Sequence, residues 1–219
     1  VAWLWLPRGF PARWLGLCLL LPAFFTPPPR PPAGSAWVDV IDVGQGLAVL
    51  VRSSEHNLLY DTGPQYSTDT NAGQRVVLPY LRAKGVKRLD ALVVSHRDKD
   101  HSGGMDAIRE GVPVNRFLSS MLDESGENCV NGQHWEWEGV RFTILHPELT
   151  DYTLPTKKTN NLSCVLRVEA AGQSVLLTGD IEAKDERALI ARLPQALSST
   201  VLVVPHHGGK GSSTPEFIT

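Results

Sequence analysis

Four short apolar runs, far apart along the chain, each end in side chains that can bind a metal ion. Each run is rich in β-favouring residues, which predicts a strand. The groups that follow them are Asp61, His96 to His101, Asp180, and His206 with His207. If these strands share a sheet, their ends converge on one edge and build one polar site. No internal repeat is visible, so the pattern indicates convergence in space and not duplication.

The densest group is the loop 95–104, which directly follows the apolar run 91–94. Its metal-competent side chains are His96, Asp98, Asp100 and His101. The first two alternate to one side as residues i and i+2, and the last two begin the next turn and can face a second ion. A solvated charged turn is the usual explanation of such a loop. Ligand spacing directly behind a buried strand favours a metal site instead.

The remaining pattern alternates strands and helices. Strands are predicted at 37–43, 47–51, 57–60, 140–145, 164–169, 174–177 and 200–204, and helices at 76–84, 105–110 and 181–193. Both assignments follow from the period of the apolar residues. In 219 residues this pattern indicates one full α/β domain with an additional segment at the start.

Charge and cysteine content limit the possible partners and metal sites. The formal net charge of −2 gives no electrostatic argument for a polyanionic partner, because domains that grip nucleic acid by its backbone are usually basic. The cysteines are Cys18, Cys129 and Cys164. Their odd number and the lack of a CxxC pair argue against a disulfide framework or a thiolate zinc site. A single bridge between Cys129 and Cys164 remains open, and the compartment stays undecided.

Residues 1–32 differ in kind from the rest. The apolar run 14–25 precedes a proline-rich stretch at 27–32, and its twelve residues fall short of the roughly 20 that span a bilayer. A signal peptide, an interfacial segment and the last hydrophobic element of a membrane domain all fit this composition. The missing initiator methionine favours the last. We therefore expect a membrane-proximal segment and linker at 1–32, and a folded domain at 33–219 that is incomplete at its C-terminus.

Together these motifs resemble the metallo-β-lactamase fold superfamily. The loop His96-x-Asp98-x-Asp100-His101 is similar to the superfamily's HxHxDH signature, with aspartate in place of its second histidine. Asp61 in Asp-Thr-Gly resembles the first motif, and Asp180 resembles the aspartate that bridges two metals. The resemblance implies an αββα sandwich.

Three further stretches resemble the metallo-hydrolase domain at the C-terminal end of the ComEC competence protein family, the membrane channel for transforming DNA. They are Asp42-Val-Gly-Gln-Gly46, Asn160-Asn-Leu-Ser163 and Val204-Pro-His-His-Gly208. The resemblance implies a nuclease that degrades single-stranded DNA beside a channel formed by the same full-length chain, with other competence proteins as further partners. It also implies a multi-pass inner-membrane protein. This domain is then expected on the external face, since one strand must be removed before the other enters.

The ligand set implied by the resemblance is oxygen-rich. It comprises Asp98, Asp100, Asp180, His96, His101 and His206. Carboxylate in place of imidazole shifts the preference of two divalent ions from zinc toward manganese, and both remain open. Such a pair, about 3.5 to 4 Å apart, would promote in-line attack on a phosphodiester. Asp100 would orient the nucleophile and His207 would protonate the leaving group.

Substrate contacts and two departures from the superfamily complete the expectation. Candidates for binding substrate are Asp61, Asn161 and Ser163. Taken by itself, Asp61 is also typical of a residue that forms a turn. The third motif normally supplies a histidine, but Thr159, Asn160 and Asn161 occupy that segment, so the first metal lacks an imidazole. The superfamily's last histidine would lie beyond Thr219, which predicts an incomplete site.

Three other functions fit the same residues. A soluble relative could hydrolyse a thioester or a lactone with the same metals. A non-catalytic module could guide DNA or brace the channel, and the altered third motif favours this view. A secreted hydrolase could lose its first 36 residues by cleavage.

Overall fold

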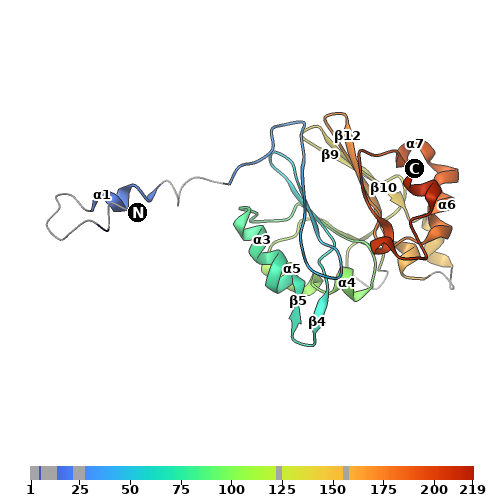
Figure 1. The fold of residues 1–219 in the computed structure, drawn as a ribbon, viewed down its shortest axis with the longest axis horizontal. Coiled ribbons are helices and arrows are strands. Elements are labelled where there is room, and N and C mark those ends of the chain that lie inside the picture. The colour runs from blue at the N-terminus through green and yellow to red at the C-terminus, as the bar shows by residue number, and fades with distance from the viewer. Residues whose placement is uncertain (1–4, 6–13, 22–27, 122–124, 155–157) are drawn as a thin grey trace.

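The computed structural model describes residues 5, 14–21, 28–121, 125–154 and 158–219, and its body has four layers (Figure 1). Two β-sheets pack face to face, and helices cover both outer faces. This helix–sheet–sheet–helix order confirms the expected αββα sandwich.

The first sheet has the strand order β1-β2-β3-β6-β7-β8. Its strands are β1 (Trp37–Val40), β2 (Val49–Arg52), β3 (Asn57–Tyr60), β6 (Ala91–Val94), β7 (Phe117–Ser119) and β8 (Glu127–Asn128). The pairs among β1, β2 and β3 are antiparallel, and those from β3 to β8 are parallel. A separate hairpin, β4 (Gln65–Ser67) and β5 (Thr70–Asn71), projects beside α4 (Figure 1).

The second sheet has the order β13-β12-β11-β10-β9. Its strands are β9 (His134–Trp137), β10 (Val140–His146), β11 (Val165–Ala170), β12 (Gln173–Leu177) and β13 (Val201–Val203). All neighbours are antiparallel except β12 and β13. The parallel end of each sheet therefore carries the strands that lead into the polar motifs.

The helices are mostly short. They are α1 (Leu15–Cys18), η2 (Gly73–Val77), α3 (Leu78–Ala83), α4 (Lys99–Ser102), α5 (Met105–Gly111), η3 (Leu149–Thr153), η4 (Asn160–Leu162), α6 (Ala183–Arg192), α7 (Pro194–Leu197), η5 (Pro205–Gly208) and α8 (Pro215–Ile218). The first sheet is covered by η2, α3 and α5, and the second by α6. The helix predicted at 76–84 is thus a π-helical turn continued by α3.

Alternation along each strand divides the interior into three clusters. On β6, Ala91 and Val93 face the second sheet, whereas Leu92 and Val94 pack under η2, α3 and α5. Leu189 of α6 packs in the third cluster, over the other face of the second sheet. Because β6 is buried on both faces, its sequence is continuously apolar, as expected for a central parallel strand.

A disulfide joins Cys129 to Cys164 inside the sandwich, so the single bridge left open by the sequence is present. Both cysteines are fully buried. The Tyr60 hydroxyl donates a hydrogen bond to the Cys164 carbonyl at 2.6 Å, which links β3 of the first sheet to the residue that precedes β11 of the second. The two sheets are therefore held together by covalent and polar contacts as well as by apolar packing.

The four strands that end in polar motifs are divided between the two sheets. β3 and β6 belong to the first sheet, and β12 and β13 to the second. Their ends still meet, because face-to-face packing brings the matching edges of the two sheets together. The site therefore lies across the sandwich at one edge.

The N-terminal segment contacts the body near its end. The Arg30 guanidinium donates to the Asn57 Oδ1 at 2.7 Å and to the carbonyls of Ser53 and Ser54. Part of the predicted apolar run, residues 22–25, lies outside the described residues. Across the described part of the chain, none of the helices combines the length and the hydrophobicity needed to cross a bilayer.

Candidate metal centre

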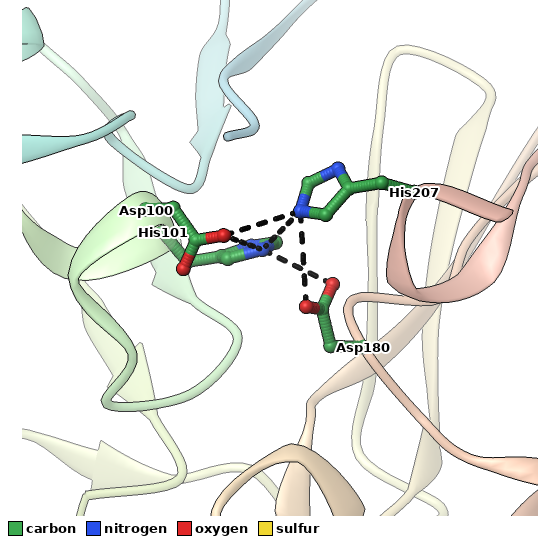
Figure 2. A group of neighbouring side chains, drawn as sticks. All are labelled: Asp100, His101, Asp180 and His207. Atoms are coloured by element: carbon green, nitrogen blue, oxygen red, sulfur yellow. Dashed lines mark hydrogen bonds and ion pairs between the residues drawn. The ribbon is translucent and has the colours of Figure 1, made fainter. Parts of the chain in front are cut away.

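Four side chains from three separate segments form a compact polar group at the sandwich edge (Figure 2). They are Asp100 and His101 from α4, Asp180 after β12, and His207 from η5. One potential ligand atom from each lies within 4.8 Å of all the others. Two imidazoles and two carboxylates at this spacing are a donor set that holds divalent ions in proteins, and the group supports binding of such an ion.

The contacts within this group point at one small volume. The His101 Nε2 lies 3.0 Å from the Asp180 Oδ1, and the His207 Nε2 lies 3.3 Å from the Asp100 Oδ2. The two Nε2 atoms are 3.2 Å apart. Because histidine binds metals through such a nitrogen, this convergence is the geometry that a ligand set requires.

His96 and Asp98 lie next to this group. The His96 Nε2 lies 3.8 Å from the Asp98 Oδ2 and 3.9 Å from the Asp180 Oδ2. This nitrogen is buried, and none of the described residues forms a hydrogen bond with it. A buried polar atom is costly to leave unpaired, so the position of this nitrogen fits the role of a metal-ligand atom.

Backbone geometry at His206 and His207 is unusual. Both residues have left-handed backbone angles, with φ of 51° and 52°. Such angles in non-glycine residues cost of the order of 1–3 kcal/mol each and cluster at functional sites. The turn directs His207 into the four-residue group, whereas the His206 Nε2 stays 3.9 Å from the Asp180 Oδ2.

The sequence had assigned the ligand role to His206 and the proton-donor role to His207. In the structure His207 belongs to the compact group of four, and the His206 Nε2 lies as far from the Asp180 Oδ2 as the His96 Nε2 does, at 3.9 Å.

Asp61 is buried beside the candidate ligands. Its carboxylate accepts hydrogen bonds from the Ser95 backbone N–H (2.6 Å), the Ser95 hydroxyl (2.8 Å) and the His101 Nδ1 (2.7 Å). The residue is fully buried. The prediction that Asp61 contacts substrate is therefore wrong, and its geometry is that of a group that orients metal ligands.

Ser95 extends this support to the other histidine. The Ser95 hydroxyl donates its one hydrogen to Asp61. The Ser95 Oγ must therefore accept the hydrogen bond that joins it to the His96 Nδ1 at 2.9 Å. The Nε2 of His96 is then the nitrogen with a free lone pair. Asp61 thus fixes the tautomer of His101 directly and that of His96 through Ser95, a role the sequence did not suggest. Position beside a ligand was the only available signal for Ser95.

Asn161 and Ser163 bond to the loop that carries Asp180. The Ser163 Oγ is fully buried and accepts a hydrogen bond from the Asp180 backbone N–H at 3.0 Å. The Asn161 amide exchanges two hydrogen bonds with Glu182, at 3.0 and 3.1 Å. Both side chains therefore shape the loop that carries Asp180, and their contact with a substrate phosphate stays a prediction. Thr159 supports a ligand instead, since its hydroxyl donates to the Asp98 Oδ1 at 2.9 Å.

Charge within the site separates the two central histidines. Burial lowers the pKa of His101, but the carboxylates of Asp61 and Asp180 outweigh it and raise the pKa to about 10. Burial also lowers the pKa of His96, and the neighbouring His101 charge lowers it further. Without a metal, His101 is therefore protonated at neutral pH and His96 is neutral.

We expect metal affinity to rise with pH. An ion must replace the proton on His101, so below a pKa of about 10 the apparent dissociation constant should fall by about tenfold per pH unit. Titration calorimetry between pH 6 and 8, in buffers with different ionisation enthalpies, measures both the affinity and the release of one proton by the ion that binds His101. Affinity that does not change over this range would contradict the assignment of His101 as a ligand.

Comparison with known proteins agrees with this geometry. A family model described as the metallo-beta-lactamase superfamily matches residues 41–219. Competence protein ComA of Neisseria gonorrhoeae is 39% identical over 215 residues, which cover 97% of this chain and 30% of that protein. ComE operon protein 3 of Bacillus subtilis is 35% identical over 210 residues, which cover 83% of this chain and 26% of that protein. The chain thus spans less than a third of the length of these relatives.

A solved structure shows the same fold. A Cronobacter sakazakii metallo-beta-lactamase with a HARLDQ motif, mutant S60, superposes with a TM-score of 0.54 over 81% of this chain and 79% of that chain. The two sequences are 16% identical, so the likeness concerns the fold alone.

Proposed function

The chain belongs to the metallo-beta-lactamase superfamily, and we propose that it is the nuclease domain of a competence protein, cleaving phosphodiester bonds of single-stranded DNA during uptake. The competence relatives support a role in DNA uptake, and the histidine and aspartate side chains of the site support metal-dependent hydrolysis. Because the chain spans only part of those relatives, the membrane channel in the same full-length protein and the other competence partners belong to the proposal too.

The observation that carries the proposal is the position of Asp180 between two ligand groups. Its Oδ1 faces the His101 Nε2 at 3.0 Å, and its Oδ2 faces the His96 Nε2 at 3.9 Å. One carboxylate with histidine nitrogens beside both of its oxygens suits a pair of ions that share it. We assign His96 and Asp98 to one ion, with Asp100, His101 and His207 at the other.

Two divalent ions, when bound, would polarise the phosphate and lower the pKa of water. Three of the chain's assigned side chains then have distinct tasks. Asp180 holds the two ligand groups in register, and Asp100, which is partly exposed, accepts a hydrogen bond from the attacking water and orients it. His206, about a third exposed at the rim, protonates the leaving oxygen. The many carboxylate oxygens favour manganese, with zinc as the other candidate.

The buried disulfide supports an external location for this domain. Disulfides form and persist in oxidising compartments and are rare in a reducing cytosol. Cys129 and Cys164 are bridged, and their bridge lies beside Ser163, which supports the Asp180 loop. A domain of an inner-membrane protein that folds on the periplasmic or outer face has the redox environment that this bridge needs.

Cleavage assays on the purified domain test the proposal. We expect labelled single-stranded DNA to be degraded with manganese or zinc, and EDTA or the variant Asp100→Ala to abolish this activity. The exposed Asp106 of α5 provides the control Asp106→Asn, which should retain it. Turnover of a thioester or a lactone with DNA left intact would support a small-molecule hydrolase instead. A protein that binds no metal and cleaves no substrate would support the non-catalytic bracing module.

A further inference from the structure

A groove of about 760 Å³ opens directly beside the candidate metal centre. Its walls come from three segments: Gln45, the stretch 64–66 at the start of the β4–β5 hairpin, and the stretch 97–100. The last stretch includes the assigned ligands Asp98 and Asp100, so whatever occupies the groove lies against the reacting centre. The volume is within the range of pockets that hold small organic groups.

Tyr66 provides a fixed aromatic surface in this groove. Its side chain is 46% exposed, although large aromatic residues usually bury more of their area. Its hydroxyl donates a hydrogen bond to the Val43 carbonyl at 2.9 Å. That bond holds the far end of the ring, so the exposed face is oriented before any ligand arrives.

The hairpin that carries Tyr66 is held tightly against the ligand loop. A Cβ on Gly103 would collide with the backbone of Pro64 and Gln65, and one on Gly46 would collide with the Asp100 carbonyl. The Leu47 backbone N–H donates to that same carbonyl at 3.2 Å. The close approach fixes Tyr66 relative to Asp100, which makes the distance from aromatic ring to metal centre a property of the fold.

The groove is lined by both positively and negatively charged side chains. Arg97 and Lys99 are exposed, and they alternate along the chain with Asp98 and Asp100. Among the described residues, the Lys99 ammonium has no ion-pair partner. Once bound ions offset the carboxylates, the Lys99 ammonium makes the groove attractive to phosphate, although the whole chain carries a net charge of −2.

We propose that the groove is a nucleotide subsite for single-stranded DNA, in which an unpaired base stacks on Tyr66 and the adjoining phosphate lies between Lys99 and the metal centre. This rests on the proposed nuclease function and specifies how its substrate is held. Stacking on an aromatic ring requires a base that is free of its partner strand, and it tolerates any base. The subsite therefore selects single strands without reading their sequence.

The contribution of stacking can be measured by removing either the DNA base or the Tyr66 ring. With manganese present, kcat/KM is compared for an oligonucleotide and for the same oligonucleotide with abasic nucleotides. In the wild-type protein the ratio should be about five to a hundred, the range that one base–aromatic stack provides. In Tyr66→Ala it should fall to near one, whereas Tyr66→Trp should preserve it. Thr68→Ala, in the same hairpin but outside the groove, is the matched control.

The outcomes separate the subsite from the nuclease itself. A wild-type ratio that survives in a folded Tyr66→Ala variant, checked by circular dichroism, overturns the subsite while the nuclease stands. A small phosphodiester that carries no base reports on the reaction alone. If the wild-type protein cleaves neither this compound nor DNA, the proposed function fails and the subsite fails with it.

Discussion

Replacement of Asp180 by alanine is expected to reduce metal-dependent phosphodiester cleavage by at least about a thousandfold, because several kcal/mol of transition-state stabilisation depend on the ions that it holds. Asp180 is the one carboxylate of the assigned ligands that lies within 4 Å of all four site histidines. Its loss leaves each ligand group short of a donor and removes the group that joins them.

Metal content and single-turnover rates test this expectation together. Asp180→Ala should bind fewer ions per chain, as measured by mass spectrometry of the metal after dialysis. Its fold should persist, because the Ser163 Oγ is bonded to the Asp180 backbone N–H and not to its side chain. Asp106→Asn again serves as the exposed carboxylate control. A folded Asp180→Ala protein with wild-type turnover would remove the basis of the proposed metal centre.

Replacement of Asp61 by asparagine is expected to weaken metal affinity by about 10- to 100-fold, the usual effect of losing a group that orients ligands. Asparagine has the same shape and tolerates the left-handed backbone at this position, where φ is 58°. Its amide, however, provides one acceptor and two donors. If its NH2 group replaces Oδ1, it faces the Ser95 backbone N–H, and if it replaces Oδ2, it faces the Ser95 hydroxyl and the His101 Nδ1. Either orientation sets donor against donor and disturbs the support of His101 and His96.

A buried carboxylate elsewhere provides the matched control. Asp90 is also buried, and it accepts from the Asn57 backbone N–H at 2.9 Å and from the Arg88 Nε at 3.0 Å. Asp90→Asn should lower the free energy of unfolding in urea and leave metal affinity unchanged. If Asp61→Asn behaves in the same way, then Asp61 only stabilises the fold, and its proposed role in orienting His96 and His101 is wrong.

The sequence predicted the elements of this fold well where the local pattern was strong. The strands at 57–60 and 91–94 have the predicted bounds, since both contain consecutive apolar residues that are buried on two faces. The short strands β7 and β8 were not predicted, because pairing with a neighbouring strand stabilises them more than their own composition does. The predicted helix at 181–193 begins later, at Ala183.

The residues of the candidate metal centre were predicted less completely than the strands were. His96, Asp98, Asp100, His101 and Asp180 were identified as candidate ligands because of residue type and position after strands. Adjacent residues are harder to distinguish: which of His206 and His207 turns inward depends on two left-handed backbone angles that no local pattern signals. Asp61, Asn161 and Ser163 were found, but their burial and hydrogen-bond partners, and hence their tasks, were not.

The sequence by itself determined which chemical groups are present and at which strand ends they lie, because periodicity and residue type are local properties. Only the tertiary structure decided that these ends belong to two sheets, that Cys129 meets Cys164, and that Tyr66 lines a groove beside Asp100. Those outcomes depend on contacts between segments far apart in the chain. The packing of the two sheets and their helices determines these contacts, and a short stretch of sequence does not include both of the segments that meet.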